Sequence, residues 1–133
     1  MAKIISDRAL LKKIYRQYYI EFCGFDVDNP VRTTKNFVPI DMERVGRDLG
    51  VNPGLVFGRL YYHLDKKYGY KQPEGALVPL FVLRMGEDRH LINFPLLAGV
   101  LADLEGAYWR FMLPIVVSGV AVIISLAGVI WSS

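Results

Sequence analysis

Hydrophobic residues are distributed along the chain in three ways, and each predicts a different kind of structure. In residues 7–23, 53–68 and 95–111 the apolar positions recur at spacings of three and four, which is typical of amphipathic helices. Two short apolar runs, 76–84 and 89–94, lie on either side of a turn-forming stretch and predict a β-hairpin. A final run, 111–131, is apolar and uninterrupted. The predicted fold is therefore mainly α with a small β-hairpin, followed by one C-terminal transmembrane helix.

Capping residues and prolines indicate where the first predicted elements begin and end. Ser6 or Asp7 can cap the first helix, which we expect to stop near Gly24. A polar loop then leads to 37–40, a short extended segment. Pro39 cannot donate a backbone hydrogen bond, so it confines this segment to the edge of a sheet.

Two further helices are predicted to follow in quick succession. Asp41 can cap a short helix over 42–49, and Gly50 can end it in a left-handed conformation. Asn52 then caps the next helix, with Pro53 at its first position, where a missing amide proton costs nothing. The spacing predicts two helices joined by a tight turn.

The apolar run at 111–131 carries no charge and is long enough to cross a bilayer core of roughly 30 Å at about 1.5 Å per residue. Arg110 directly precedes it and nothing basic follows, so the positive-inside tendency predicts a cytoplasmic N-terminal domain and a C-terminus on the opposite side. Trp109 and Trp131 suit interfacial positions at its two ends. We expect a single-pass protein with no signal peptide and no domain beyond the bilayer.

Three segments are expected along the chain: a soluble domain over 1–95, a juxtamembrane amphipathic helix over 96–110, and the membrane helix. The formal net charge is +3, which fits an acidic partner without selecting nucleic acid over anionic lipid. Cys23 is the only cysteine, so an internal disulfide is excluded. We expect Cys23 to fill space in the core beside Phe22 and Phe25.

Residues 49–60, with the sequence LGVNPGLVFGRL, resemble the turn signature of winged helix-turn-helix domains. In that family a Leu-Gly-Val tripeptide, a capping residue and apolar residues further on lock two helices together. The resemblance implies that Gly46 lies where the helices touch and that Gly50 has a positive φ. It also implies a shared core of Val51, Val56, Leu60 and Leu64.

The same resemblance implies an exposed face on the third helix that enters the major groove of double-stranded DNA. The candidates for this contact are Arg59, Tyr62, His63 and Lys66. The first helix adds a basic strip suited to phosphates. Its members are Arg8, Lys12, Lys13 and Arg16.

Other residues favour a protein partner instead. Glu87 and Asp88 lie at the expected hairpin tip, where their charges repel a phosphate backbone. The exposed side of the third helix also carries Leu55, Tyr62 and Tyr70, a mixture of aliphatic and aromatic residues that is common at protein interfaces.

We find no pattern that predicts catalysis or a cofactor. His63 and His90 fall on different elements, and the chain has no His/Cys metal-binding motif and no phosphate-binding glycine motif. We therefore expect a protein that is not an enzyme and that has no metal or cofactor.

Small residues form one stripe along the predicted membrane helix, at steps of three and four. They are Ser118, Ala121, Ser125 and Gly128. Such a stripe allows close approach of another helix, either in a homodimer or in a larger complex.

Two functions remain open. The first is a membrane-tethered winged-helix regulator that binds DNA at the cytoplasmic face. The alternative is a tail-anchored accessory subunit that uses the same fold for protein contacts within a larger membrane complex.

Overall fold

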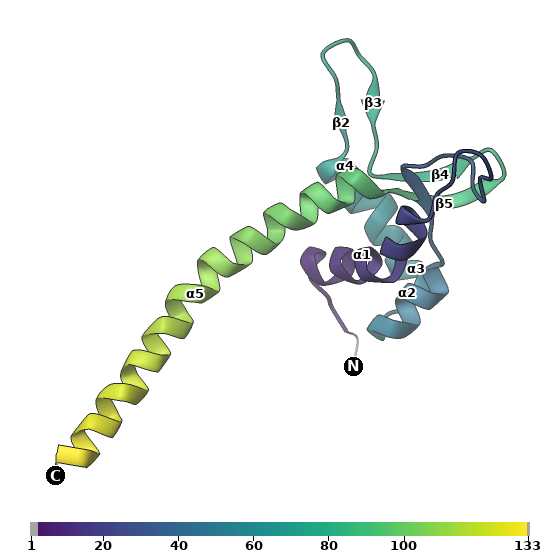
Figure 1. Ribbon diagram of the computed structural model, residues 1–133. Helices are drawn as coiled ribbons and strands as arrows, with labels where there is room; N and C mark the ends of the chain where they lie inside the picture. The colour runs from purple at the N-terminus through teal and green to yellow at the C-terminus, as the bar shows by residue number, and fades with distance from the viewer. Residues whose placement is uncertain (1–2, 133) are drawn as a thin grey trace. The chain divides into compact units, whose positions relative to one another are not determined.

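The computed structural model describes residues 3–132. The chain divides into two units, of which the described parts are 3–101 and 102–132. The first unit contains all the strands, all the helices before the last one, and the beginning of the last helix (Figure 1). The fold is mainly α-helical with small antiparallel sheets and a long apolar C-terminal helix, as the hydrophobic pattern predicts.

The first helix and first strand form where the caps predict. Helix α1 spans Asp7–Cys23, and the Ser6 hydroxyl accepts a hydrogen bond from the Ala9 amide at 3.1 Å. Strand β1, Phe37–Pro39, lies at the edge of its sheet. Pro39 has no backbone amide proton to donate, and an edge strand tolerates this.

The next two helices meet at a tight turn. Helix α2, Met42–Leu49, begins at the Asp41 cap and ends at Gly50, whose φ of 71° is left-handed. Gly46 lies against the following segment, so closely that a Cβ atom there would stand 2.5 Å from the carbonyl oxygen of Val51. Both glycines therefore have the geometric roles that the turn signature predicts.

The third helix is continuous but not uniform. It begins as α3, Pro53–Gly58, widens into a π-helical segment, η1, Arg59–Leu64, and ends as α4, Asp65–Tyr68. In a π-helix the backbone bonds span five residues, so each turn holds more residues than in an α-helix. Side chains after Gly58 therefore do not follow the regular α-helical projection.

A three-stranded antiparallel sheet completes the first unit, in the order β1, β5, β4. Strands β4, Phe81–Met85, and β5, Asp88–Asn93, form the predicted hairpin, and β1 pairs with β5 so that Val38 faces Ile92.

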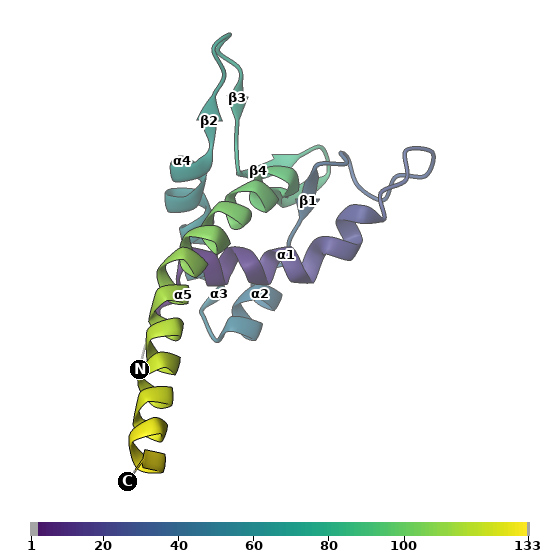
Figure 2. The same cartoon turned by 60° about the vertical axis from the view of Figure 1, so that its left-hand side comes forward.

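The expected strand over 76–84 is wrong in its first half. Its residues Leu77–Val78 form β3, which pairs with β2, Tyr70–Lys71, in a separate two-stranded hairpin. Pro79 lies between β3 and β4, where the run changes partner. The β2–β3 hairpin extends away from the three-stranded sheet in both views (Figures 1 and 2).

The core lies between α1, the third helix, the sheet and the first turns of the last helix. It contains Leu11, Ile14, Leu60, Leu64, Leu91 and Leu97, all fully buried. The Phe94 ring stacks on Tyr15 at 5.3 Å and on Phe22 at 4.8 Å between ring centroids. Cys23, however, is exposed, so the expectation that it fills the core is wrong. Cys23 directly follows Phe22 on α1, and of these two residues it is Phe22 whose ring stacks on Phe94.

Helix α5, Phe94–Ser132, is 39 residues long and continues through Pro114. Its first residues Phe94, Leu97, Val100 and Leu101 are buried within the first unit. Its later part has a mean hydropathy of 2.6 over 18 residues, and by length and composition it is able to cross a membrane.

Candidate functional site

Asp7, at the start of α1, lies among three basic side chains of the third helix. Its Oδ1 accepts a hydrogen bond from Arg59 Nη2 at 2.7 Å, and its Oδ2 accepts one from Lys67 Nζ at 3.2 Å. His63 Nδ1 stands 3.9 Å from Oδ1. Burial acts to raise the pKa of Asp7, but the hydrogen bonds and charges of Lys67 and Arg59 outweigh it, so the pKa is lowered.

The four candidates for contact with the DNA groove differ in their distance from the Asp7 carboxylate. Arg59 and His63 are drawn toward Asp7, and the Arg59 side chain is only 28% exposed. Tyr62 and Lys66 are exposed, and so is His63, whose side chain is 52% exposed. In a regular α-helix Arg59 would lie on the same side as Tyr62 and Lys66, but the π-helical turn changes these angular positions.

The first turn of α3 presents few groups that could read base edges. In helix-turn-helix proteins the N-terminal residues of the second helix contact the bases. Here those positions hold Pro53, Gly54 and Leu55, and the Asn52 side-chain oxygen accepts the Gly54 amide at 2.8 Å as a cap. Leu55 is 64% exposed, so the surface at this point is apolar.

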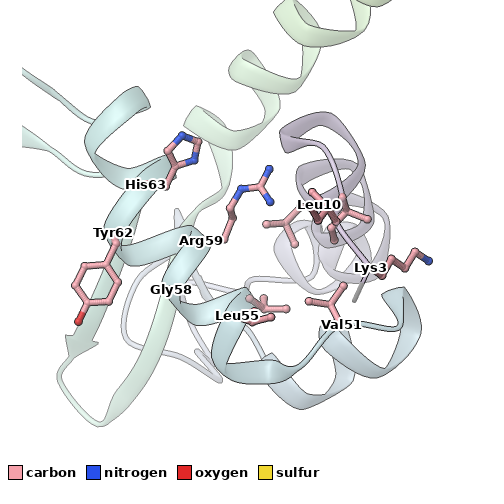
Figure 3. Close-up of a pocket in the computed structure, with 11 residues that line it drawn as sticks. Lys3, Leu10, Val51, Leu55, Gly58, Arg59, Tyr62 and His63 are labelled. Atoms are coloured by element: carbon pink, nitrogen blue, oxygen red, sulfur yellow. The ribbon is translucent and has the colours of Figure 1, made fainter. Parts of the chain in front are cut away.

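A pocket of about 390 Å³ opens beside this turn, between the N-terminal segment, α1 and η1. Leu10, Val51 and Leu55 come together in it from separate elements, while the ring of Tyr62 turns away from α1 (Figure 3). Its lining is mostly aliphatic, and the residues in it that can carry a positive charge are Lys3, Arg59 and His63. No sequence pattern marked this site, because Lys3, Ile4 and Ile5 precede the first predicted helix.

The basic strip of α1 is not uniformly available for phosphate contacts. Lys13 Nζ lies 3.9 Å from an Asp48 carboxylate oxygen of α2, and Asp48 also accepts a hydrogen bond from Gln17. Arg16 is exposed, whereas Arg8 and Lys12 are half-buried.

The acidic turn between β4 and β5 packs on the loop that precedes β1. The Asp88 carboxylate accepts the Thr33 amide at 2.8 Å, and the Thr33 hydroxyl donates to the Met85 carbonyl at 3.1 Å. A Cβ atom at Gly86 would stand 2.9 Å from the Thr33 hydroxyl oxygen. The Asp88 carboxylate at the predicted hairpin tip is thus hydrogen-bonded to Thr33 within the protein.

The β2–β3 hairpin carries exposed residues of mixed character. Tyr70 is 53% exposed and Leu77 is 77% exposed, with Lys66 and Lys71 lining the same shallow hollow of about 290 Å³. Sequence reasoning identified Tyr70 and Lys66 but not the hairpin that places Leu77 near them.

All four residues of the predicted small-residue stripe lie on α5 and are exposed. The Ser125 hydroxyl donates to the Ala121 carbonyl of its own helix at 2.9 Å. A Cβ atom at Gly128 would contact nothing within 4 Å. The helix surface is therefore open at this position.

Within residues 3–132 no group of three or more His, Cys, Asp or Glu side chains could hold a metal ion. His90 lies against aromatic rings, 5.5 Å from Phe57 and 6.2 Å from Phe81 between centroids. Its φ of 56° is positive. The arrangement around His90 is one of packing.

Comparison of the whole chain with protein-family models, with curated proteins and with solved structures gives no match.

Proposed function

We propose that this protein is a membrane-anchored winged-helix adaptor, in which the exposed side of α3, η1 and α4 docks on a protein partner. The element order supports the winged-helix assignment: α1, β1, α2, tight turn, third helix and hairpin, with the sheet ordered β1, β5, β4. The β2–β3 hairpin is then an insertion between the third helix and the sheet.

The apolar part of α5 acts as a single membrane span in this proposal. Its length and hydropathy support that role. Arg110 directly precedes the apolar run, which favours a cytoplasmic first unit. The adaptor would then present its docking face at the cytoplasmic surface of the bilayer.

The surface around Leu55 and Tyr62 is the observation that carries the choice of a protein partner. These side chains are 64% and 66% exposed, and an aliphatic pocket adjoins them. Aromatic and apolar residues of this kind are enriched where proteins meet. The arginine best suited to reading guanine, Arg59, is instead hydrogen-bonded to Asp7.

DNA binding at the membrane is the second candidate. The tight α2–α3 turn and the exposed Lys66 and Arg16 favour it. A regulator of this kind would bind duplex DNA with strong salt dependence, because its contacts would be mainly to phosphates.

Affinity purification of the full chain from its native membrane in mild detergent, with and without nuclease, separates the two candidates. An adaptor retains a stoichiometric protein partner after nuclease treatment. It loses that partner in Tyr62→Ala but keeps it in Tyr19→Ala, a change of another exposed tyrosine on α1. Loss of all co-purifying protein on nuclease treatment, together with a duplex shift at low salt, would replace the adaptor by the DNA-binding candidate.

A further inference from the structure

We propose that the pocket between the N-terminal segment and η1 binds a single-chain anionic amphiphile, with the chemistry of a medium-chain fatty acid. This inference goes beyond the adaptor function and requires no knowledge of the partner. It rests on the volume of the pocket, on its aliphatic lining and on the sign of the charges at its rim.

The interior of the pocket suits an unbranched apolar chain. Its volume of about 390 Å³ lies toward the small end of ligand pockets, which span roughly 300–1,000 Å³. Burial of an apolar chain against aliphatic walls needs no hydrogen-bond partners, whereas a sugar or a nucleotide would leave polar groups unpaired. The aliphatic walls consist of Ile4, Ile5, Leu10, Val51, Leu55 and Val56. Leu10, Val51 and Leu55 are labelled in Figure 3.

The rim selects an anionic head group. The lining residues that can carry a charge near neutral pH are Lys3, Arg59 and His63, and none of them is acidic. The nearest opposing charge is Asp7, which is not part of the lining and already lies against Arg59 and Lys67. Two permanent cations around one carboxylate leave an excess of positive charge, so a cationic head group would be repelled.

The head group has room at the solvent-facing side of the pocket. The His63 side chain is 52% exposed, and Lys3 is also exposed. A carboxylate placed there stays partly hydrated while its chain occupies the aliphatic interior, which avoids the cost of burying a charge. Such a ligand could come from the aqueous phase or from an anionic lipid of the bilayer, and both sources share this chemistry.

Photolabelling tests the site in the intact protein. The full chain is placed in phosphatidylcholine nanodiscs and exposed to decanoate that carries a diazirine on its chain. We expect label on 3–5 and 51–63, and we expect unlabelled decanoate to compete while decyltrimethylammonium does not. Peptide mass spectrometry locates the label, and nanodiscs without protein supply the background.

Substitutions at exposed lining residues keep the fold while they change the site. Because Leu55 is 64% exposed, Leu55→Asp should leave the fold intact and reduce labelling by roughly tenfold, since it places a carboxylate against the chain. Lys3→Glu should reduce labelling by roughly threefold, as expected for one exposed charge. Lys35→Glu, an equal charge change on an exposed loop residue away from the pocket, is the matched control and should have no effect.

The source of the ligand follows from the lipid of the nanodisc. If labelling falls when phosphatidylglycerol replaces phosphatidylcholine, an anionic bilayer lipid occupies the pocket; if it is unchanged, the ligand is a free amphiphile. Either result supports the site. Label confined to 102–132, or equal competition by decyltrimethylammonium, would overturn it. None of these readouts involves a protein partner, so the adaptor function can fail while the ligand site stands, and the reverse.

Discussion

Arg59 donates a hydrogen bond of 2.7 Å to Asp7, although 52 positions separate the two residues along the chain. This contact fixes the start of α1 against η1, and the Arg59 side chain is left 28% exposed. Lys67 reaches the second oxygen of the same carboxylate at 3.2 Å. Arg59, which the winged-helix resemblance makes a candidate for DNA contact, therefore takes part in a contact between two helices.

Stability should depend on pH through Asp7. Its pKa is lower in the folded protein than its ordinary value of 3.8, so the charged form stabilises the fold above that pH. The contribution is lost as pH falls from about 3.8 through the folded pKa. We expect Asp7→Asn to lower the free energy of unfolding by about 1–3 kcal/mol at pH 7. Thermal unfolding followed by circular dichroism should show this difference.

The control for Asp7 is Asp26→Asn, which changes an acidic residue of the loop after α1. The melting temperatures of wild type and Asp7→Asn should converge only as pH falls below the folded pKa of Asp7, which lies below 3.8, because both then carry an uncharged side chain at position 7. A gap that stays constant down to the acid limit would show that the charge of Asp7 does not stabilise the fold.

The packing of Gly46 gives a second prediction. Gly46→Ala places a Cβ atom 2.5 Å from the Val51 carbonyl oxygen, and backbone on both sides limits relaxation. Overpacking of this kind costs about 1–3 kcal/mol. Gly99→Ala is the matched control, since a Cβ atom there meets nothing within 4 Å. It should stabilise the helix by about 0.5–1 kcal/mol, because alanine favours helices over glycine. Urea unfolding of both variants measures the difference, and equal effects would contradict the proposed close contact.

Local signals explain why much of the fold could be predicted. Ser6, Asp41 and Asn52 each cap the helix that follows them, and each does so through contacts with residues two or three positions away. The left-handed Gly50 is likewise a local feature. These elements depend on short-range chemistry, so the sequence alone is sufficient to place them.

The parts that could not be predicted depend on contacts between distant residues. In the β2–β3 hairpin Tyr70 pairs with Val78. The apolar run continues past Pro79, so the sequence does not show that β3 and β4 are separate strands. The pocket depends on where the segment before α1 crosses η1. The Asp7–Arg59 pair similarly joins two helices, and no periodicity within either helix indicates it.

Asp65 provides a third prediction, at the junction between α4 and β4. Its Oδ1 accepts the Leu80 amide at 2.9 Å and the Phe81 amide at 3.0 Å. Both residues are buried, so Asp65→Ala leaves two amide groups unpaired, at about 1–3 kcal/mol each. Asp65→Asn keeps an oxygen acceptor, so it should lower the free energy of unfolding clearly less than Asp65→Ala does. Hydrogen–deuterium exchange of 77–85 reports on this junction; equal protection in the two variants would exclude this role for the carboxylate.

Arg32 is almost fully buried, with 9% of its surface exposed, and it joins the loop before β1 to the end of α1. Its guanidinium donates to the carbonyl oxygens of Glu21, Phe22, Thr34 and Lys35, at 2.7–3.3 Å. Arg32→Met keeps an unbranched side chain but removes the guanidinium, so it leaves these carbonyls and the last turn of α1 without their donor. We expect a loss of about 3 kcal/mol or more in the free energy of unfolding.

Arg32→Lys separates the effect of charge from that of geometry. A lysine ammonium has three donors at one point, so it cannot span four carbonyls as the planar guanidinium does. The variant should therefore recover only part of the lost stability. Arg47→Met, on the exposed side of α2, removes the same groups and should change stability by less than about 0.5 kcal/mol. If Arg32→Lys matched the wild type in urea unfolding, charge alone would account for the role of Arg32, and the fourfold hydrogen bonding would contribute nothing measurable.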